Sequence, residues 1–140
     1  TESPVNIRVF VIIEYKNKDN GIVHIPINRE FLERSLRRQI LLDSWGQIEL
    51  FISKKTKKSE NITTSALIKN YFSPNIVPLI ITFFRETRNS FHGNGMYSHS
   101  KKQIEISIDD IDYSLNPGKE IKFADWNFLF NLINKSLGYL

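Results

Sequence analysis

The sequence has 140 residues, of which 41% are apolar and 24% charged, and its net charge is +4. This length is near the most common domain size and can bury a self-sufficient core, so we expect residues 1–140 to fold as a single domain. The absence of cysteine excludes disulfides, thiolate metal sites and cysteine nucleophiles, and gives no reason to expect secretion. The longest apolar run, Val9–Ile13, is too short to cross a bilayer, and Thr1–Pro4 has no basic leader. We therefore expect a cytoplasmic protein with no membrane partner.

Residues 5–27 fit two different secondary structures. Ser3-Pro4 is typical of a helix start, in which a capping residue is followed by proline in the first turn. Against this, β-branched apolar residues occupy alternate positions from Val5 to Ile13. Asn20-Gly21 then precedes a second apolar run, residues 22–27, which is typical of a β-hairpin. The local pattern leaves a helix and a hairpin open.

A long amphipathic helix is predicted from Arg29 to about Lys54, with Asn28 as its N-cap. Apolar residues recur there at helical spacings of three to five: Leu32, Leu36, Ile40, Trp45, Ile48 and Ile52. Gly46 inside this helix weakens it by about 1 kcal/mol relative to alanine. A glycine at this position would also allow another helix to approach closely.

The end of this helix runs into a cluster of four lysines: Lys54, Lys55, Lys57 and Lys58. One interpretation is a solvated loop. The other is a patch that binds the phosphate backbone of RNA, which the small positive net charge permits without requiring it. Both interpretations stay open, and the four lysines are candidate RNA-binding residues.

Two shorter helices are predicted next. Thr63 or Thr64 can cap a helix that runs to Phe72. Pro74 and Pro78 interrupt the pattern, and because proline is tolerated in the first helical turn, we expect a further helix from near Asn75. That helix reaches residues 85–92 and is stopped by the glycines of Gly93-Asn94-Gly95.

Alternating residues then indicate a small hairpin of two or three strands between Gln103 and Phe123, with Asn116-Pro117-Gly118 as a turn signal. Asp125 is expected to cap a last amphipathic helix that ends at Gly138. Its predicted apolar face consists of Trp126, Leu129, Phe130, Ile133 and Leu137. The fold class predicted from these elements is mainly α, with a small β-hairpin at about residues 103–123 before the last helix.

The segment Arg85-Glu86-Thr87-Arg88-Asn89-Ser90-Phe91-His92 is the best candidate for chemistry. Arg85, Arg88 and His92 have the spacing i, i+3, i+7, which places them on one face of a helix. An arginine offers two donors to phosphate oxygens, and a histidine can transfer a proton near neutral pH. This pairing suits cleavage of RNA without a metal, by attack of the ribose 2′-hydroxyl on its own phosphate.

A purely structural interpretation of the same residues is also open. Arginine and histidine in the last turn of a helix interact favourably with the negative end of its dipole, and an Asn-Gly pair simply ends helices. A metal site is not expected, because the three histidines, His24, His92 and His99, have no acidic residue beside them at ligand spacing. We expect no cofactor.

The run Arg88-Asn89-Ser90-Phe91-His92-Gly93-Asn94-Gly95-Met96-Tyr97 resembles the signature of HEPN domains, in particular their abortive-infection-like branch. The resemblance covers roughly Pro74–Leu137. Arg88 and His92 enclose three residues where the family motif has four to six. Arg85 restores a gap of six, but Glu86 then follows it where the family prefers Asn, Asp or His. Which arginine belongs to the motif therefore stays open.

The resemblance implies a HEPN-like helical bundle in which residues 4–16 form a helix, and we adopt the helix for that segment. It also implies a homodimer with a shared cleft between the motif-bearing helices. Many members of the family are metal-independent endoribonucleases of toxin–antitoxin, abortive-infection or other defence systems. By this resemblance Arg88, Asn89 and His92, together with Arg85, are the candidate catalytic residues.

Two functions follow as expectations. The first is a metal-independent endoribonuclease of the toxin or defence kind, acting at a dimer interface and controlled by an antitoxin or another protein partner. In this role an arginine stabilises the added negative charge, His92 acts as acid or base, and Asn89 orients the pair. The alternative is a non-catalytic HEPN-like module that binds a nucleotide, RNA or a protein.

Overall fold

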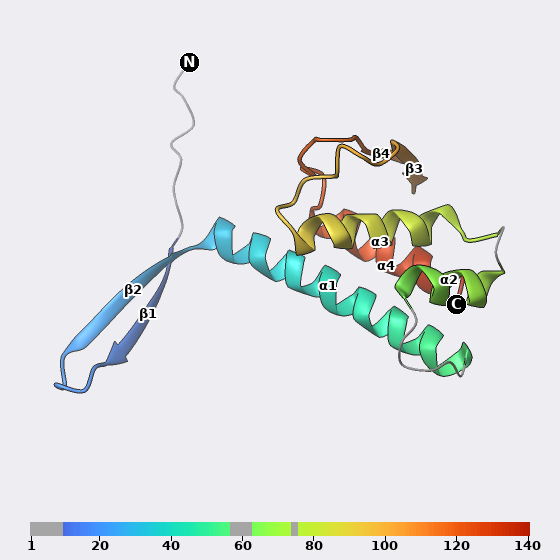
Figure 1. Ribbon diagram of the computed structural model, residues 1–140. Helices are drawn as coiled ribbons and strands as arrows, with labels where there is room; N and C mark the ends of the chain where they lie inside the picture. The colour runs from blue at the N-terminus through green and yellow to red at the C-terminus, as the bar shows by residue number, and fades with distance from the viewer. Residues whose placement is uncertain (1–9, 57–62, 74–75) are drawn as a thin grey trace, which may run out of the picture. The chain divides into compact units, whose positions relative to one another are not determined.

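The computed structural model describes residues 10–56, 63–73 and 76–140. Within these residues four helices and two antiparallel hairpins follow in the order β1, β2, α1, α2, α3, β3, β4, α4 (Figure 1). The chain divides after Arg38 into two compact units. The expected mainly helical chain, with a hairpin before its last helix, is confirmed.

The first unit contains a hairpin of β1 (Phe10–Lys16) and β2 (Ile22–Asn28). Asn20 adopts φ 61°, and the Asn17 side chain accepts hydrogen bonds from the backbone N–H groups of Asp19 and Gly21, at 3.1 and 2.8 Å. The hairpin alternative is therefore confirmed over these strands, and the helix adopted for residues 4–16 is wrong from Phe10 onward. Alternation of β-branched residues and a strong Asn-Gly turn outweigh the Ser-Pro signal. Residues 4–9 lie outside the described residues.

Helix α1 (Arg29–Thr56) begins in the first unit and ends in the second. Asn28 caps it as predicted, since its side-chain oxygen accepts from the backbone N–H groups of Glu30 and Phe31, at 2.9 and 3.3 Å. In the second unit its buried residues are Leu41, Trp45, Ile48 and Ile52. Apart from the neighbouring backbone of α1 itself, no described atom lies within 4 Å of the position that a Cβ on Gly46 would take, so no described helix uses the close approach that this glycine allows.

Helices α2 (Thr64–Phe72) and α3 (Leu79–His92) follow. Thr63 caps α2 by accepting a hydrogen bond from the Ala66 backbone N–H at 3.3 Å, as predicted. Helix α3 begins at Leu79, later than the restart expected near Asn75, which itself lies outside the described residues. Pro78 is the N-cap rather than a helical residue, and the residue before a proline is pushed out of the helical region.

The second hairpin consists of β3 (Ile104–Ile108) and β4 (Ile111–Leu115). Its turn is Asp109-Asp110, where both residues have positive φ, 50° and 64°, as a tight two-residue hairpin turn requires. The third strand considered for residues 120–123 does not form in the described chain. That segment makes only an isolated bridge between Met96 and Glu120.

Helix α4 (Trp126–Leu137) is capped by Asp125, which accepts from the Phe128 backbone N–H at 2.8 Å. Its predicted apolar face is only partly the buried one. The buried residues are Phe128, Leu129, Leu132 and Ser136. By contrast, Phe130 and Leu137 are 52% and 53% exposed. Leu129 is therefore the only residue of the predicted face that is fully buried, and the buried stripe lies to one side of the prediction.

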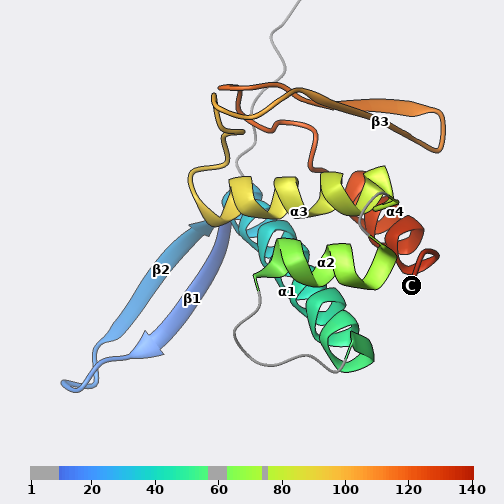
Figure 2. The same ribbon diagram turned by 45° about the vertical axis from the view of Figure 1, so that its right-hand side comes forward.

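Helix α3 lies at the centre of the second unit, between α1 and the β3–β4 hairpin (Figures 1 and 2). On one side, the ring of Phe84 packs against Trp45 of α1, with ring centroids 5.2 Å apart. On the other side, Phe83 joins an aromatic cluster with Tyr113, Phe123 and Phe128. Burial of these large rings is the main force that holds α3 in place.

Candidate functional site

The candidate residues lie in the last two turns of α3, where the helix is firmly ended. The backbone N–H of Gly93 donates to the Asn89 carbonyl at 3.3 Å, and that of Gly95 donates to the Ser90 carbonyl at 2.8 Å. Gly95 adopts φ 79°, a conformation that glycine reaches without strain. The predicted stop at Gly93-Asn94-Gly95 is confirmed, and it leaves His92 as the last helical residue.

One face of α3 carries all four candidate side chains. In a continuous helix Arg85, Arg88, Asn89 and His92 fall within an arc of about 100°. The opposite face buries Glu86, Thr87 and Ser90, and the hydroxyls of Thr87 and Ser90 each donate to a backbone carbonyl one turn earlier at 2.8 Å. The polar residues of this segment thus separate into a buried set and a more exposed candidate set.

The C-terminal end of this face consists of the half-buried Arg88 and the exposed Asn89 and His92. Arg88 Nη1 donates to Asn89 Oδ1 at 3.1 Å, so the amide holds the guanidinium beside it. His92 is exposed, and its imidazole makes no hydrogen bond or ion pair with any described residue. An arginine oriented by an amide and a free imidazole one turn away can together contact a phosphate and exchange a proton with it.

Arg85 has a different environment. Its Nη2 lies 3.3 Å from Glu86 Oε1, and the Glu86 side chain is only 10% exposed. The second carboxylate oxygen of Glu86 accepts from Lys101, which follows α3 in the chain. Two cations therefore neutralise one buried carboxylate. This pairing draws Arg85 toward the protein, and Arg88 is the arginine more available to a ligand.

Glu86 and Lys101 were not among the residues singled out from the sequence. Glu86 lies three residues after Phe83 and four before Ser90, on the buried side of the helix. A charged residue at a core-facing position requires a partner. The core-facing position of Glu86 therefore indicated that this carboxylate has a partner, but nothing in the sequence indicated that the partner would be Lys101.

The lysine cluster does not join this site in the described chain. Lys54 and Lys55 are exposed in the last turn of α1, and Lys55 Nζ lies 5.6 Å from the centroid of the Phe51 ring. Helices α1 and α3 run in opposite directions in Figures 1 and 2, so their C-terminal ends lie apart. Lys57 and Lys58 fall outside the described residues.

The other two histidines belong to other segments of the chain and have neighbours. His24 Nε2 is 3.3 Å from Glu14 Oε2 across the first hairpin. The ring of His99 covers Gly118, where an added Cβ would come within 2.1 Å of it. In residues 10–56, 63–73 and 76–140, no three potential metal ligands among His, Asp and Glu come together.

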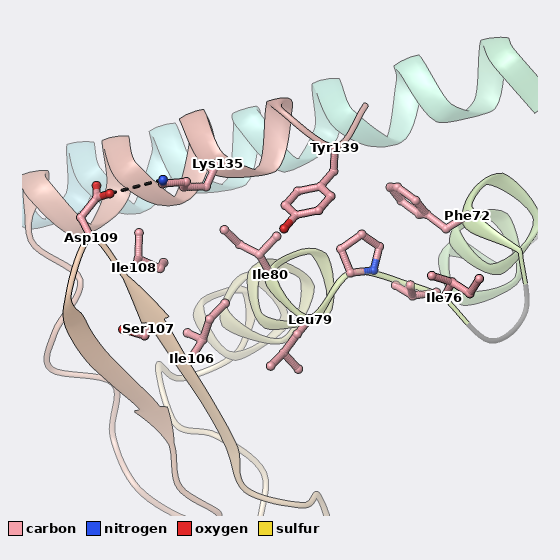
Figure 3. Close-up of a pocket in the computed structure, with 12 residues that line it drawn as sticks. Phe72, Ile76, Leu79, Ile80, Ile106, Ser107, Ile108, Asp109, Lys135 and Tyr139 are labelled. Carbon is pink, nitrogen blue, oxygen red and sulfur yellow. Dashed lines mark ion pairs between the residues drawn. The ribbon is translucent and has the colours of Figure 1, made fainter.

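A separate cavity of about 680 Å³ lies at the other end of α3 (Figure 3). Its walls are largely apolar and include Phe72, Ile80 and Ile106, and an ion pair of 3.4 Å between Lys135 and Asp109 lies at its edge. None of the candidate residues lines it. The cavity therefore contributes nothing to the proposed chemistry.

Comparison with protein-family models, with curated proteins and with solved structures found no match to this chain. Among the described helices, none combines the length and the apolar character needed to span a membrane.

Proposed function

We propose that this chain is a metal-independent endoribonuclease of the toxin or defence kind, whose reactive groups are Arg88, Asn89 and His92 on one face of α3. The observation that carries the proposal is the joint position of these residues. A guanidinium held by the Asn89 amide lies one helical turn from a free, exposed imidazole. The resemblance of the Arg88–Tyr97 run to HEPN domains supports the same assignment.

The proposed reaction is an attack of the ribose 2′-hydroxyl on the adjacent phosphorus. The new P–O2′ bond forms as the bond to the 5′-oxygen of the next nucleotide breaks. One proton leaves the 2′-hydroxyl and one is delivered to the departing 5′-oxygen, and imidazole serves either role near neutral pH. Arg88 stabilises the extra negative charge on the pentacoordinate phosphorus.

This reaction also supports a dimer. Proton removal and proton delivery occur on opposite sides of the phosphorus, whereas each α3 face has one exposed histidine. Two copies of α3 facing across a shared cleft bring two imidazoles to one phosphate. In this arrangement the His92 of one copy acts as base and the His92 of the second copy acts as acid.

The engagement of Arg85 by Glu86 favours a second candidate function, a module that binds RNA without cutting it. A site with only one available arginine has less charge stabilisation for the transition state. Such a module needs no facing copy, so a chain that stays monomeric at micromolar concentration in sedimentation would favour this alternative.

The two arginines provide a sharp test of the proposal. In a cleavage assay with labelled RNA, Arg88→Ala is expected to lower the rate about 10²–10³-fold, because it removes the donor to the developing negative charge. Arg85→Ala, its matched control on the same face, is expected to lower the rate much less, since the Arg85 guanidinium pairs with Glu86. EDTA is expected to leave the wild-type rate unchanged.

Each result separates the candidates. No cleavage by the wild type would leave only the binding module. A larger loss for Arg85→Ala than for Arg88→Ala would assign the motif to Arg85. A rate abolished by EDTA and restored by a divalent cation would contradict the metal-independent mechanism.

A further inference from the structure

The loop that follows α3 and the loop that follows β4 are joined by backbone hydrogen bonds. The Tyr97 N–H donates to the Lys119 carbonyl at 3.0 Å, and the Gly118 N–H donates to the Tyr97 carbonyl at 2.7 Å. The Ile121 N–H donates to the Gly95 carbonyl at 2.9 Å. Residues 116–122 are thus held directly against the exit of the helix that ends at His92.

Tyr97 positions two lysines at once. Its backbone N–H donates to the Lys119 carbonyl, and its phenol donates to the Lys102 carbonyl at 2.6 Å. Tyr97 is only 2% exposed, and burial raises the pKa of its phenol, with the charge of Glu86 adding to the rise. The phenol therefore stays protonated and remains a donor. The backbones of Lys102 and Lys119 are thus both bonded to the same buried residue, one through its phenol and the other through its main chain.

A third lysine, Lys122, follows the buried Ile121, whose N–H is bonded to Gly95. Lys102, Lys119 and Lys122 form what we call the lysine rim. All three are exposed, and none makes a side-chain hydrogen bond or ion pair with a described residue. Lys101, by contrast, is bound to Glu86.

The charge of the two loops is mainly positive. Residues 93–103 and 116–125 contain four lysines and two acidic residues, Glu120 and Asp125. Lys101 is bound to Glu86 and Asp125 caps α4, so the three lysines of the rim lie beside one further acidic residue, Glu120. Loops of this kind bind a phosphate backbone through charge, without reading bases.

We propose that the lysine rim binds the phosphates of single-stranded RNA that flank the phosphate held at Arg88 and His92. This inference rests on the proposed ribonuclease function and assigns its substrate path to the loops after α3 and β4. A flexible single strand can follow such a charged surface, as strands do in other backbone-binding grooves. The rim thereby replaces the lysines at the end of α1 as the principal RNA contact.

The test measures binding of a labelled 2′-O-methyl oligouridylate, which lacks the attacking hydroxyl and cannot be cut, at increasing salt. We expect the triple variant Lys102→Gln, Lys119→Gln, Lys122→Gln to make the slope of log affinity against log salt concentration shallower by about 2. Each lost phosphate contact on a single strand accounts for about 0.7 of this change. Lys54→Gln with Lys55→Gln tests the lysines at the end of α1 and is expected to change the slope less than the triple variant does. Glu120→Gln is expected to tighten binding, and this gain cannot come from misfolding.

An unchanged slope in the triple variant, or a flattened slope in the α1 variant alone, would overturn the inference. Affinity for an acidic protein but none for RNA would overturn it as well. Cleavage of unmodified RNA is measured in parallel. If binding depends on the rim but RNA is not cut, the ribonuclease function is excluded and RNA binding by the rim is supported. If RNA is cut but binding does not depend on the rim, the ribonuclease function is supported and RNA binding by the rim is excluded.

Discussion

Replacing His92 with alanine is expected to lower the rate of RNA cleavage by about 10²–10⁴-fold, the range that general acid–base catalysis supplies. The side chain is exposed at the end of α3 and makes no hydrogen bond or ion pair with described residues, so its loss removes a proton-transfer group at little cost to the fold. The melting temperature and the affinity for a non-cleavable RNA are therefore expected to stay close to those of the wild type.

His24→Ala is the matched control for this experiment. His24 is also exposed, with 60% of its side chain accessible, but it lies in the first hairpin beside Glu14. We expect this variant to cut RNA at the wild-type rate. Equal cleavage by the wild type and His92→Ala would remove His92 from the mechanism.

Replacing Phe128 with alanine is expected to destabilise the fold by about 3–5 kcal/mol. Phe128 is fully buried and packs against Phe83, Tyr113 and Phe123, with ring centroids 6.2, 4.7 and 5.0 Å away. A loss of this size is a large share of the 5–15 kcal/mol that typically stabilises a domain. Urea denaturation followed by circular dichroism measures it directly.

Phe130→Ala provides a matched control on the same helix. Phe130 is 52% exposed and its ring stacks on Trp126 at 5.8 Å, so we expect a loss of no more than about 1.5 kcal/mol. If instead Phe130→Ala proved more destabilising than Phe128→Ala, the buried face of α4 would be the one that carries Phe130, which would contradict the packing of Phe128 in the core.

The helices were predictable where apolar spacing and a capping residue agreed. Asn28, Thr63 and Asp125 were each identified as caps, and each accepts a backbone hydrogen bond at the start of its helix. The stop at Gly93-Asn94-Gly95 was also predictable, because glycine adopts the positive φ found at Gly95. At such positions the residues next to one another in the sequence are sufficient to predict where a helix begins or ends.

Prediction failed where two local signals favoured different secondary structures, or where tertiary packing determines which residues are buried. For residues 10–28, the hairpin pattern was visible, but the resemblance favoured a helix. On α4, apolar residues occupy more than half of the circumference, and periodicity cannot say which of them face α3 and which face solvent. The Asp109-Asp110 turn lacks the Asn-Gly signature of a tight hairpin and was not recognised.

The candidate site was predictable only in part. Spacing placed Arg85, Arg88 and His92 on one helical face, and the continuous helix α3 keeps them there. The pairing of Glu86 with Lys101 and the position of the lysine rim both depend on how the loops return to α3. Contacts between segments so far apart in the chain leave no local pattern in the sequence.

We expect the face of α3 that carries Arg88 and His92 to cleave RNA through the ribose 2′-hydroxyl. The most direct test of this cleavage is mass spectrometry of the products of a defined RNA cut by the wild type in EDTA. We expect a 2′,3′-cyclic phosphate on one product, a 5′-hydroxyl on the other, and no cleavage at a nucleotide that carries a 2′-O-methyl group. Products with a 3′-hydroxyl and a 5′-phosphate would show that water attacks the phosphorus, and would rule out the proposed mechanism.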